Sequence, residues 1–201
     1  MKNNTIIFAS QNENKVKEVK EMLKDYNVVS LNDIGFNEEI DETGTTFYEN
    51  ALIKCNAIKS YLDKQDKSYI ILADDSGLCV DSLNGEPGVY SARYAGTHGN
   101  NQANRDKILS NLIAKENRDA HFVCSMVLMD ENGKVYSCEG KTFGRILEKE
   151  CGDKTFCYDC IFFSNDLQKC FGECTSAEKD SVSHRGRAVE KIKEILKEIC
   201  A

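Results

Sequence analysis

The feature that most constrains this chain is the alternation of a short apolar run with an amphipathic segment at its beginning. Residues 5–9 have the length and composition of a buried strand. They lead into Ser10–Glu13, an S-x-x-E pattern typical of a helix capping box, and apolar residues then recur at helical spacing to about Asp25. A second strand is expected near 28–31. This opening predicts an α/β protein with a mixed sheet and flanking helices.

The rest of the chain continues the same alternation. A second capping box at Thr46–Glu49 begins a predicted helix that carries Asn50 and Lys54 one turn apart. The apolar strand at 69–73 is expected to end abruptly at the acidic pair Asp74–Asp75. The remaining expected elements are a helix at 101–114, a hairpin of 121–129 and 134–146, an irregular segment at 151–171 and a final helix at 183–199.

Length and composition narrow the class of protein. At about 150 residues per domain, 201 residues predict a single domain over 1–201. A net charge of -7 argues against binding to a nucleic acid polymer or an anionic membrane. Because no apolar run approaches the roughly 20 residues of a membrane span, we expect a cytoplasmic protein whose ten cysteines are reduced.

The first candidate site is Ser10–Lys15. The free amides of a helix N-terminus, the Asn12 side chain and the Lys15 ammonium could converge on phosphate oxygens. The alternative is an ordinary helix cap followed by a solvated lysine.

The second candidate site is the acidic pair Asp74–Asp75. Two carboxylates at the end of a buried strand repel each other, and a divalent cation would stabilise them. Asp41 and Glu42, in a separate acidic loop, could complete a site of oxygen ligands that suits Mg²⁺. The alternative is a turn in which one carboxylate caps main-chain amides.

Two further patterns have both a functional and a structural interpretation. His184 and Arg185 place cationic groups at the start of the last helix, where they oppose the helix dipole unless a ligand is bound or Glu178 pairs with them. A set of four cysteines has spacings that a zinc site allows, although its apolar neighbours favour cysteine acting as a small hydrophobic residue; the set is Cys157, Cys160, Cys170 and Cys174.

Taken together, five segments resemble the inosine triphosphate pyrophosphatase family, the Ham1-like enzymes, and in particular its bacterial-type branch. Each segment alone is a weak signal, whereas their order and spacing are specific and cover nearly the whole chain. The segments are 9–15, 44–54, 73–78, 85–96 and 183–185.

The resemblance implies two lobes around a central substrate cleft, a homodimer, and a Mg²⁺-dependent enzyme. Its substrates would be purine nucleoside triphosphates such as ITP, dITP and XTP, which it would hydrolyse to the monophosphate and pyrophosphate to cleanse the nucleotide pool. Asp75 would be the general base and a metal ligand, and Asp41 a second metal contact. The substrate-binding residues carried over by motif are Ser10, Gln11, Asn12, Glu13, Asn14, Lys15, Lys54, Ser76, Phe156, Cys157, Tyr158, Asp159, Lys179, His184 and Arg185.

The base-binding segment departs from the family pattern. Where the family reads Gly-Phe-Gly-Tyr-Asp-Pro, this chain has Thr155, Cys157 and Cys160 in place of the two glycines and the proline. Three alternatives therefore stay open at this point: a Maf-like nucleotide pyrophosphatase with a different base preference, a nucleotide-binding protein without catalysis, and a zinc-binding interaction module.

Overall fold

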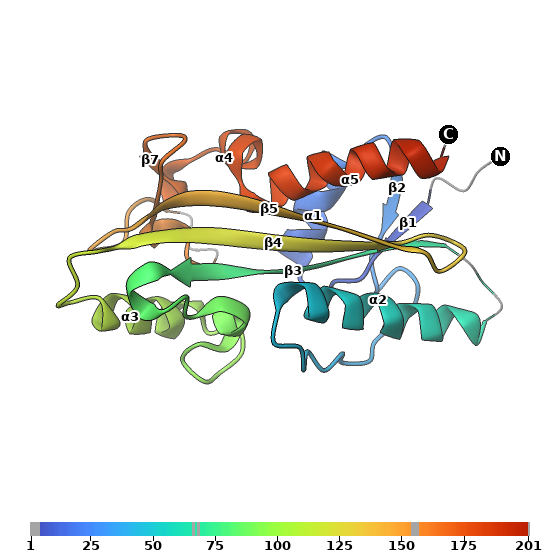
Figure 1. The fold of residues 1–201 in the computed structure, drawn as a ribbon, viewed down its shortest axis with the longest axis horizontal. Helices are drawn as coiled ribbons and strands as arrows, with labels where there is room; N and C mark the ends of the chain where they lie inside the picture. Colours follow the sequence, from blue (N-terminus) through green and yellow to red (C-terminus); the bar gives the residue numbers. More distant parts are fainter. Residues whose placement is uncertain (1–4, 66, 68, 154–156, 201) are drawn as a thin grey trace. The chain divides into compact units, whose positions relative to one another are not determined.

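A computed structural model describes residues 5–65, 67, 69–153 and 157–200 of the chain. Its centre is a seven-stranded sheet in the order β2-β1-β3-β4-β5-β6-β7 (Figure 1). The strands are β1 (Thr5–Phe8), β2 (Asn27–Val29), β3 (Ile70–Val80), β4 (Asp119–Met129), β5 (Val135–Ile146), β6 (Phe162–Ser164) and β7 (Lys169–Cys170). The strands β1, β2 and β3 are parallel, whereas β5, β6 and β7 are antiparallel. The predicted class, α/β with a mixed sheet, is confirmed.

The described residues include five α-helices beside the sheet. They are α1 (Glu13–Met22), α2 (Phe47–Asp63), α3 (Asn101–Asn111), α4 (Ser176–Val182) and α5 (His184–Cys200). The hairpin predicted around Gly133 is present: the amide of Asp130 donates to the carbonyl of Lys134 at 3.0 Å, and Gly133 has the positive φ of 82° that favours glycine.

The chain divides into two compact units. The first comprises residues 1–75, 124–139 and 188–201, and the second residues 76–123 and 140–187. Each unit has a hydrophobic core of its own. The single domain over 1–201 and the substrate cleft between two lobes stay predictions.

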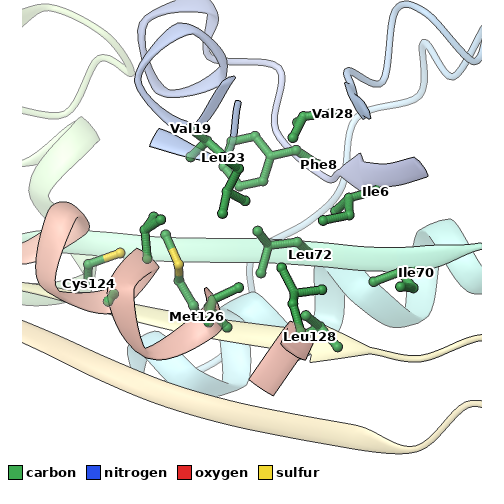
Figure 2. Packing of buried hydrophobic residues seen from close by; sticks show 14 residues of the cluster. Ile6, Phe8, Val19, Leu23, Val28, Ile70, Leu72, Cys124, Met126 and Leu128 are labelled. Carbon is green, nitrogen blue, oxygen red and sulfur yellow. The ribbon is translucent and has the colours of Figure 1, made fainter. Parts of the chain in front are cut away.

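In the first unit both faces of the sheet are apolar. Successive strand residues point to opposite sides, so consecutive apolar residues such as those of β1 supply apolar side chains to both faces. Ile6 and Phe8 lie in one core cluster, with residues of α1 and α5, whereas Ile7 lies in another with residues of α2. Figure 2 shows Phe8 lying against Val19 of α1 and against Leu23, the residue that caps the end of α1. Helices therefore cover both faces of this part of the sheet, in which β1 pairs with β3 in parallel, Ile7 opposite Ile71.

The second unit has an aromatic core. The ring of Phe122 lies 4.8 Å from that of Phe162 and 6.4 Å from that of Phe171, measured between centroids. All three side chains are almost completely buried, together with Ile108 of α3. Aromatic burial of this kind fixes β4 and β6, which come before and after the candidate base-binding segment in the chain.

Three local predictions need correction. Strand β3 does not end at Asp74 but continues through Asp75 to Val80. The N-cap of α1 is Asn12 rather than Ser10, since the Asn12 side chain accepts the amides of Asn14 and Lys15 at 3.1 and 3.2 Å. The segment 151–171, predicted to be irregular, contains β6 and β7.

A fourth difference is the helix α4, which precedes α5 and was not predicted. Its N-cap Thr175 accepts the amide of Glu178 at 3.2 Å, and the Glu178 carboxylate accepts the amide of Thr175 at 2.7 Å. This is the same capping box as at Thr46, so the sequence signal for α4 was present.

Loss of the capping box of α2 should weaken the fold measurably. Thr46 Oγ1 accepts the amide of Glu49 at 3.1 Å, and Thr46→Ala removes this bond at an exposed position. We expect the free energy of unfolding to fall by about 1 kcal/mol. Chemical denaturation measures it, with Thr97→Ala, an exposed threonine before α3, as the control. Equal stability of the two variants would contradict the role of the cap.

Candidate active site

Asp74 and Asp75 lie in the middle of β3 and, as neighbours in a strand, point to opposite faces of the sheet. The Asp74 carboxylate is completely buried, and Lys15 Nζ lies 3.3 Å from its Oδ1 and 3.1 Å from its Oδ2. Cys124 Sγ donates to the same carboxylate at 3.8 Å. Asp74 therefore holds the Lys15 ammonium in place.

Asp75 faces α2. Its Oδ2 accepts Asn50 Nδ2 at 2.9 Å, and its Oδ1 lies 3.9 Å from Lys54 Nζ. Lys54 Nζ also donates to the main-chain carbonyl of Asp74 at 3.0 Å and lies 2.9 Å from Glu42 Oε1. The helical spacing of Asn50 and Lys54 thus brings an amide and an ammonium to one carboxylate.

The charges in this cluster shift the protonation of its members. Burial raises the pKa of Asp75 above its ordinary value, against the opposite effect of the Lys54 and Lys15 ammonium groups. Burial lowers the pKa of Lys54, but Asp75, Glu42 and Asp74 raise it more strongly, and the net direction is upward. Lys54 is therefore a fixed cation, and Asp75 is a better base than an exposed carboxylate.

The carboxylates at Lys54 offer hard oxygen donors of the kind that Mg²⁺ takes. The acidic residue that reaches Lys54 is Glu42, whereas Asp41, the predicted second metal contact, is exposed. Among the described residues, no group of three or more His, Cys, Asp or Glu side chains is placed to hold a metal. Asp75 with Glu42 still fits Mg²⁺, because this ion is typically bound by one or two carboxylates and completes its shell with waters and substrate phosphates.

The predicted phosphate-binding segment surrounds the start of α1. Ser10 Oγ accepts the amide of Asn12 at 3.2 Å, and Gln11 Nε2 donates to the carbonyl of Glu38 at 3.0 Å. Glu13 and Asn14 are exposed in the first turn. Of this segment, the described contacts bring only Lys15 to the acidic residues of β3.

The predicted nucleotide contacts of the second unit form two groups. Arg185 Nη2 donates to Ser76 Oγ at 3.0 Å, and the His184 ring stacks on Phe122 with 4.9 Å between centroids and 15° between planes. Lys179 Nζ and Asp159 Oδ2 form a buried ion pair at 2.7 Å.

Tyr158 is anchored in the same unit, whereas Phe156 lies outside the described residues. The Tyr158 hydroxyl donates to the carbonyl of Ser91 at 2.7 Å, and burial raises the pKa of this hydroxyl.

In the part of the chain that the structure describes, the cysteines of this region are not grouped as a metal site would need, and their thiols make other contacts. Cys170 Sγ donates to the carbonyl of Cys151 at 3.3 Å, and Cys174 Sγ to the carbonyl of Cys170 at 3.2 Å. Burial raises the pKa of the Cys170 thiol to about 12, so it stays protonated. Cys160 is completely buried in the aromatic core, as expected for a small hydrophobic residue.

Cys157, which replaces a glycine of the family pattern, has a φ of 48°. The left-handed conformation costs a residue with a Cβ about 1–2 kcal/mol and is free for glycine. Cys157→Gly should therefore raise the free energy of unfolding by about 1 kcal/mol, after the larger entropy of a glycine in the unfolded chain is subtracted. Chemical denaturation measures it. The matched variant Cys157→Ala keeps the Cβ and should give no gain; an equal gain would contradict the strain.

The fold and the site together define the class: an α/β protein in which an inner strand of the sheet, β3, carries two buried carboxylates, each beside a lysine. The sequence model of the Ham1 family matches residues 6–195. The chain belongs to the Ham1 family.

Relatives of known name support the same assignment. The chain is 48% identical over 198 residues to the dITP/XTP pyrophosphatase of Clostridium perfringens, covering 96% of this chain and 97% of that protein. It is 45% identical over 194 residues to the dITP/XTP pyrophosphatase of Bacillus subtilis, covering 94% and 96%. The solved structure of the Staphylococcus aureus Ham1 protein is similar over 96% of this chain and 98% of that one, with a TM-score of 0.85 and 34% identity.

Proposed function

We propose that this protein hydrolyses non-canonical purine nucleoside triphosphates, ITP, dITP and XTP, to the monophosphate and pyrophosphate. The observation that carries the proposal is the Asp75–Lys54–Glu42 cluster in a chain 48% identical to a dITP/XTP pyrophosphatase. A buried carboxylate beside fixed cations suits the hydrolysis of a phosphoanhydride, whose attack needs a base and whose departing group is an anion.

In the proposed mechanism, Asp75 orients and deprotonates the attacking water. Burial raises the pKa of Asp75, and a base with a pKa nearer to neutral accepts the proton more effectively. Lys15 and Lys54 bind phosphate oxygens and stabilise the charge of the departing pyrophosphate. Asp75 and Glu42, with Asp41 as the sequence-based candidate, would hold Mg²⁺, which when bound neutralises phosphate charge. Asn50 fixes the orientation of the Asp75 carboxylate.

The remaining sequence-predicted residues of the second unit would bind the nucleoside. Phe156 would stack on the purine, and Arg185 or nearby amides would donate to its 6-keto oxygen. The 6-amino group of ATP would face those donors with a donor of its own and leave them unpaired. Because buried unpaired donors are costly, we expect ATP to be discriminated against more strongly than its shape alone would allow.

The proposal extends to the partners and the location of the protein. A homodimer and a cytoplasmic location are what the family resemblance and the composition suggest. None of the helices in the described part of the chain has the length and apolarity that crossing a membrane would take. The net charge of -7 argues against a nucleic acid polymer or an anionic membrane as a partner, and small nucleotides stay possible because a pocket needs only local basic residues.

The test is the release of pyrophosphate and monophosphate from ITP, XTP, GTP and ATP in parallel, with Mg²⁺ and then with EDTA. We expect fast release from ITP and XTP, slow release from ATP, and loss of both with EDTA. Turnover of pyrimidine nucleotides in place of purines would instead indicate the Maf-like activity. Binding of ITP without any product would indicate a nucleotide-binding protein.

A further inference from the structure

Arg105 is a buried arginine of the second unit that the sequence analysis did not single out. It lies on α3, and only 3% of its surface is exposed. Its guanidinium donates from Nε to Glu150 Oε1 at 2.7 Å, from Nη1 to the main-chain carbonyl of Cys157 at 3.0 Å, and from Nη2 to Gln102 Oε1 at 2.7 Å. A buried cation with this many directed bonds holds its partners in one geometry.

The contact with Cys157 reaches the segment that departs from the family pattern. Cys157 has the unfavourable φ of 48°, and Tyr158, the next residue, is anchored through its hydroxyl to Ser91. The bond from Arg105 fixes the carbonyl of the strained residue itself, which is the group that a change of its main-chain angles would move. Strained residues persist where the surrounding structure determines their conformation.

The geometry of the guanidinium explains why an arginine is needed here. The planar group donates in three directions at once, to a carboxylate, a main-chain carbonyl and a side-chain amide. A lysine in its place has a single nitrogen and does not reproduce this fork. Glu150 supplies the opposite charge: the hydrogen bond from Arg105 is the largest of the effects that lower the pKa of Glu150.

We propose that Arg105 is a positioning residue that holds the main chain at Cys157–Asp159 in the conformation that binds the purine base, and thereby sets base affinity and selectivity. The inference rests on the proposed function, since it takes this segment to be the base-binding segment. The partners of Arg105 named above include the main chain of this segment and none of the residues proposed to act on the phosphates. We therefore expect the loss of Arg105 to change KM and base selectivity more than kcat.

The experiment compares Arg105→Met with Arg118→Met in the full chain. Arg118 is a matched control, because it also donates three hydrogen bonds to the second unit, at 2.7 to 3.0 Å, but to the carbonyls of Ile146, Leu112 and Leu147. We expect Arg105→Met to raise KM for ITP and XTP about tenfold, to change kcat less than about twofold, and to narrow the ITP-to-ATP ratio of kcat/KM. Arg118→Met should lower stability without changing KM.

The outcomes separate this inference from the proposed function. A wild-type protein that releases no pyrophosphate overturns the proposed function. A wild-type protein that does, together with a folded Arg105→Met variant of unchanged KM and selectivity, overturns only the role of Arg105. Equal KM changes in the Arg105 and Arg118 variants also overturn it. If Arg105→Met does not fold, Arg105→Lys decides: it keeps the charge beside Glu150 but not the fork, and an unchanged KM contradicts the proposal.

Discussion

Replacing Asp75 with asparagine should lower kcat for ITP by about a thousandfold, because an amide does not accept the proton of the attacking water. The same change also removes one of the two carboxylates proposed to hold Mg²⁺. The effect should therefore appear in kcat as well as in kcat/KM, and added Mg²⁺ should not restore activity. Steady-state kinetics with ITP over a range of Mg²⁺ concentrations measure both.

The fold should survive this substitution. Asparagine has the shape of aspartate, and its side-chain oxygen can accept the hydrogen bond that Asn50 donates to Asp75. Lys54 keeps Glu42 and the carbonyl of Asp74 as partners. The midpoint of thermal unfolding should then lie close to that of the wild type.

An exposed aspartate supplies the control. Asp119→Asn, at the start of β4, should leave both kcat and the unfolding midpoint unchanged. If Asp75→Asn retains near-wild-type kcat, Asp75 is not the base, and the mechanism proposed for the cluster is wrong.

The acidic pair shows where prediction from sequence reached its limit. The apolar run before Asp74 predicted a strand correctly, and the two carboxylates were taken as its end. The strand continues because each carboxylate is compensated by a distant residue, Asp74 by Lys15 and Asp75 by Asn50 and Lys54. Asp74 and Lys15 are 59 positions apart in the sequence, and Asp75 and Asn50 are 25 positions apart. Contacts over such separations have no local sequence signature.

Elements defined by local rules were predicted well. The capping box at Thr46 begins α2 where it was expected, and the hairpin at Gly133 forms as its turn sequence indicates. Competition between neighbouring caps explains the error at Ser10, since Asn12 is an equally good N-cap and satisfies two amides.

The candidate site combines residues that sequence reasoning found with others that it missed. Glu42 was weighed but not chosen over Asp41, and only the geometry of the loop distinguishes the two adjacent acids. Asn50 was noted for its spacing with Lys54, which was the signal for its contact with Asp75. Arg105 had no signal at all, because its role depends on the distant residues Cys157 and Glu150.

Of the substitutions proposed for this protein, Gly186→Ala should lower the free energy of unfolding the most. A Cβ at this position would overlap the main-chain carbonyl oxygen of Asp180, at the end of α4. In an open helix the same change would stabilise by about 1 kcal/mol through helix propensity. Here the obstacle is the main-chain carbonyl group of Asp180, with the hydroxyl of Ser183 close by, and main chain does not move aside as a flexible side chain does. Overpacking at the upper end of its range therefore dominates, and we expect a net loss of about 2–3 kcal/mol.

The substitution should also impair nucleotide binding, because Gly186 directly follows His184 and Arg185 in the first turn of α5. Separating α4 from α5 would displace Arg185 from Ser76 Oγ and so raise KM for ITP. Urea denaturation and steady-state kinetics measure the two effects. The control is Glu190→Ala, at an exposed position on the same helix. It should change the free energy of unfolding by no more than a few tenths of a kcal/mol and should leave KM for ITP unchanged. A Gly186→Ala variant as stable as this control would mean that the close approach of the two helices relaxes without cost.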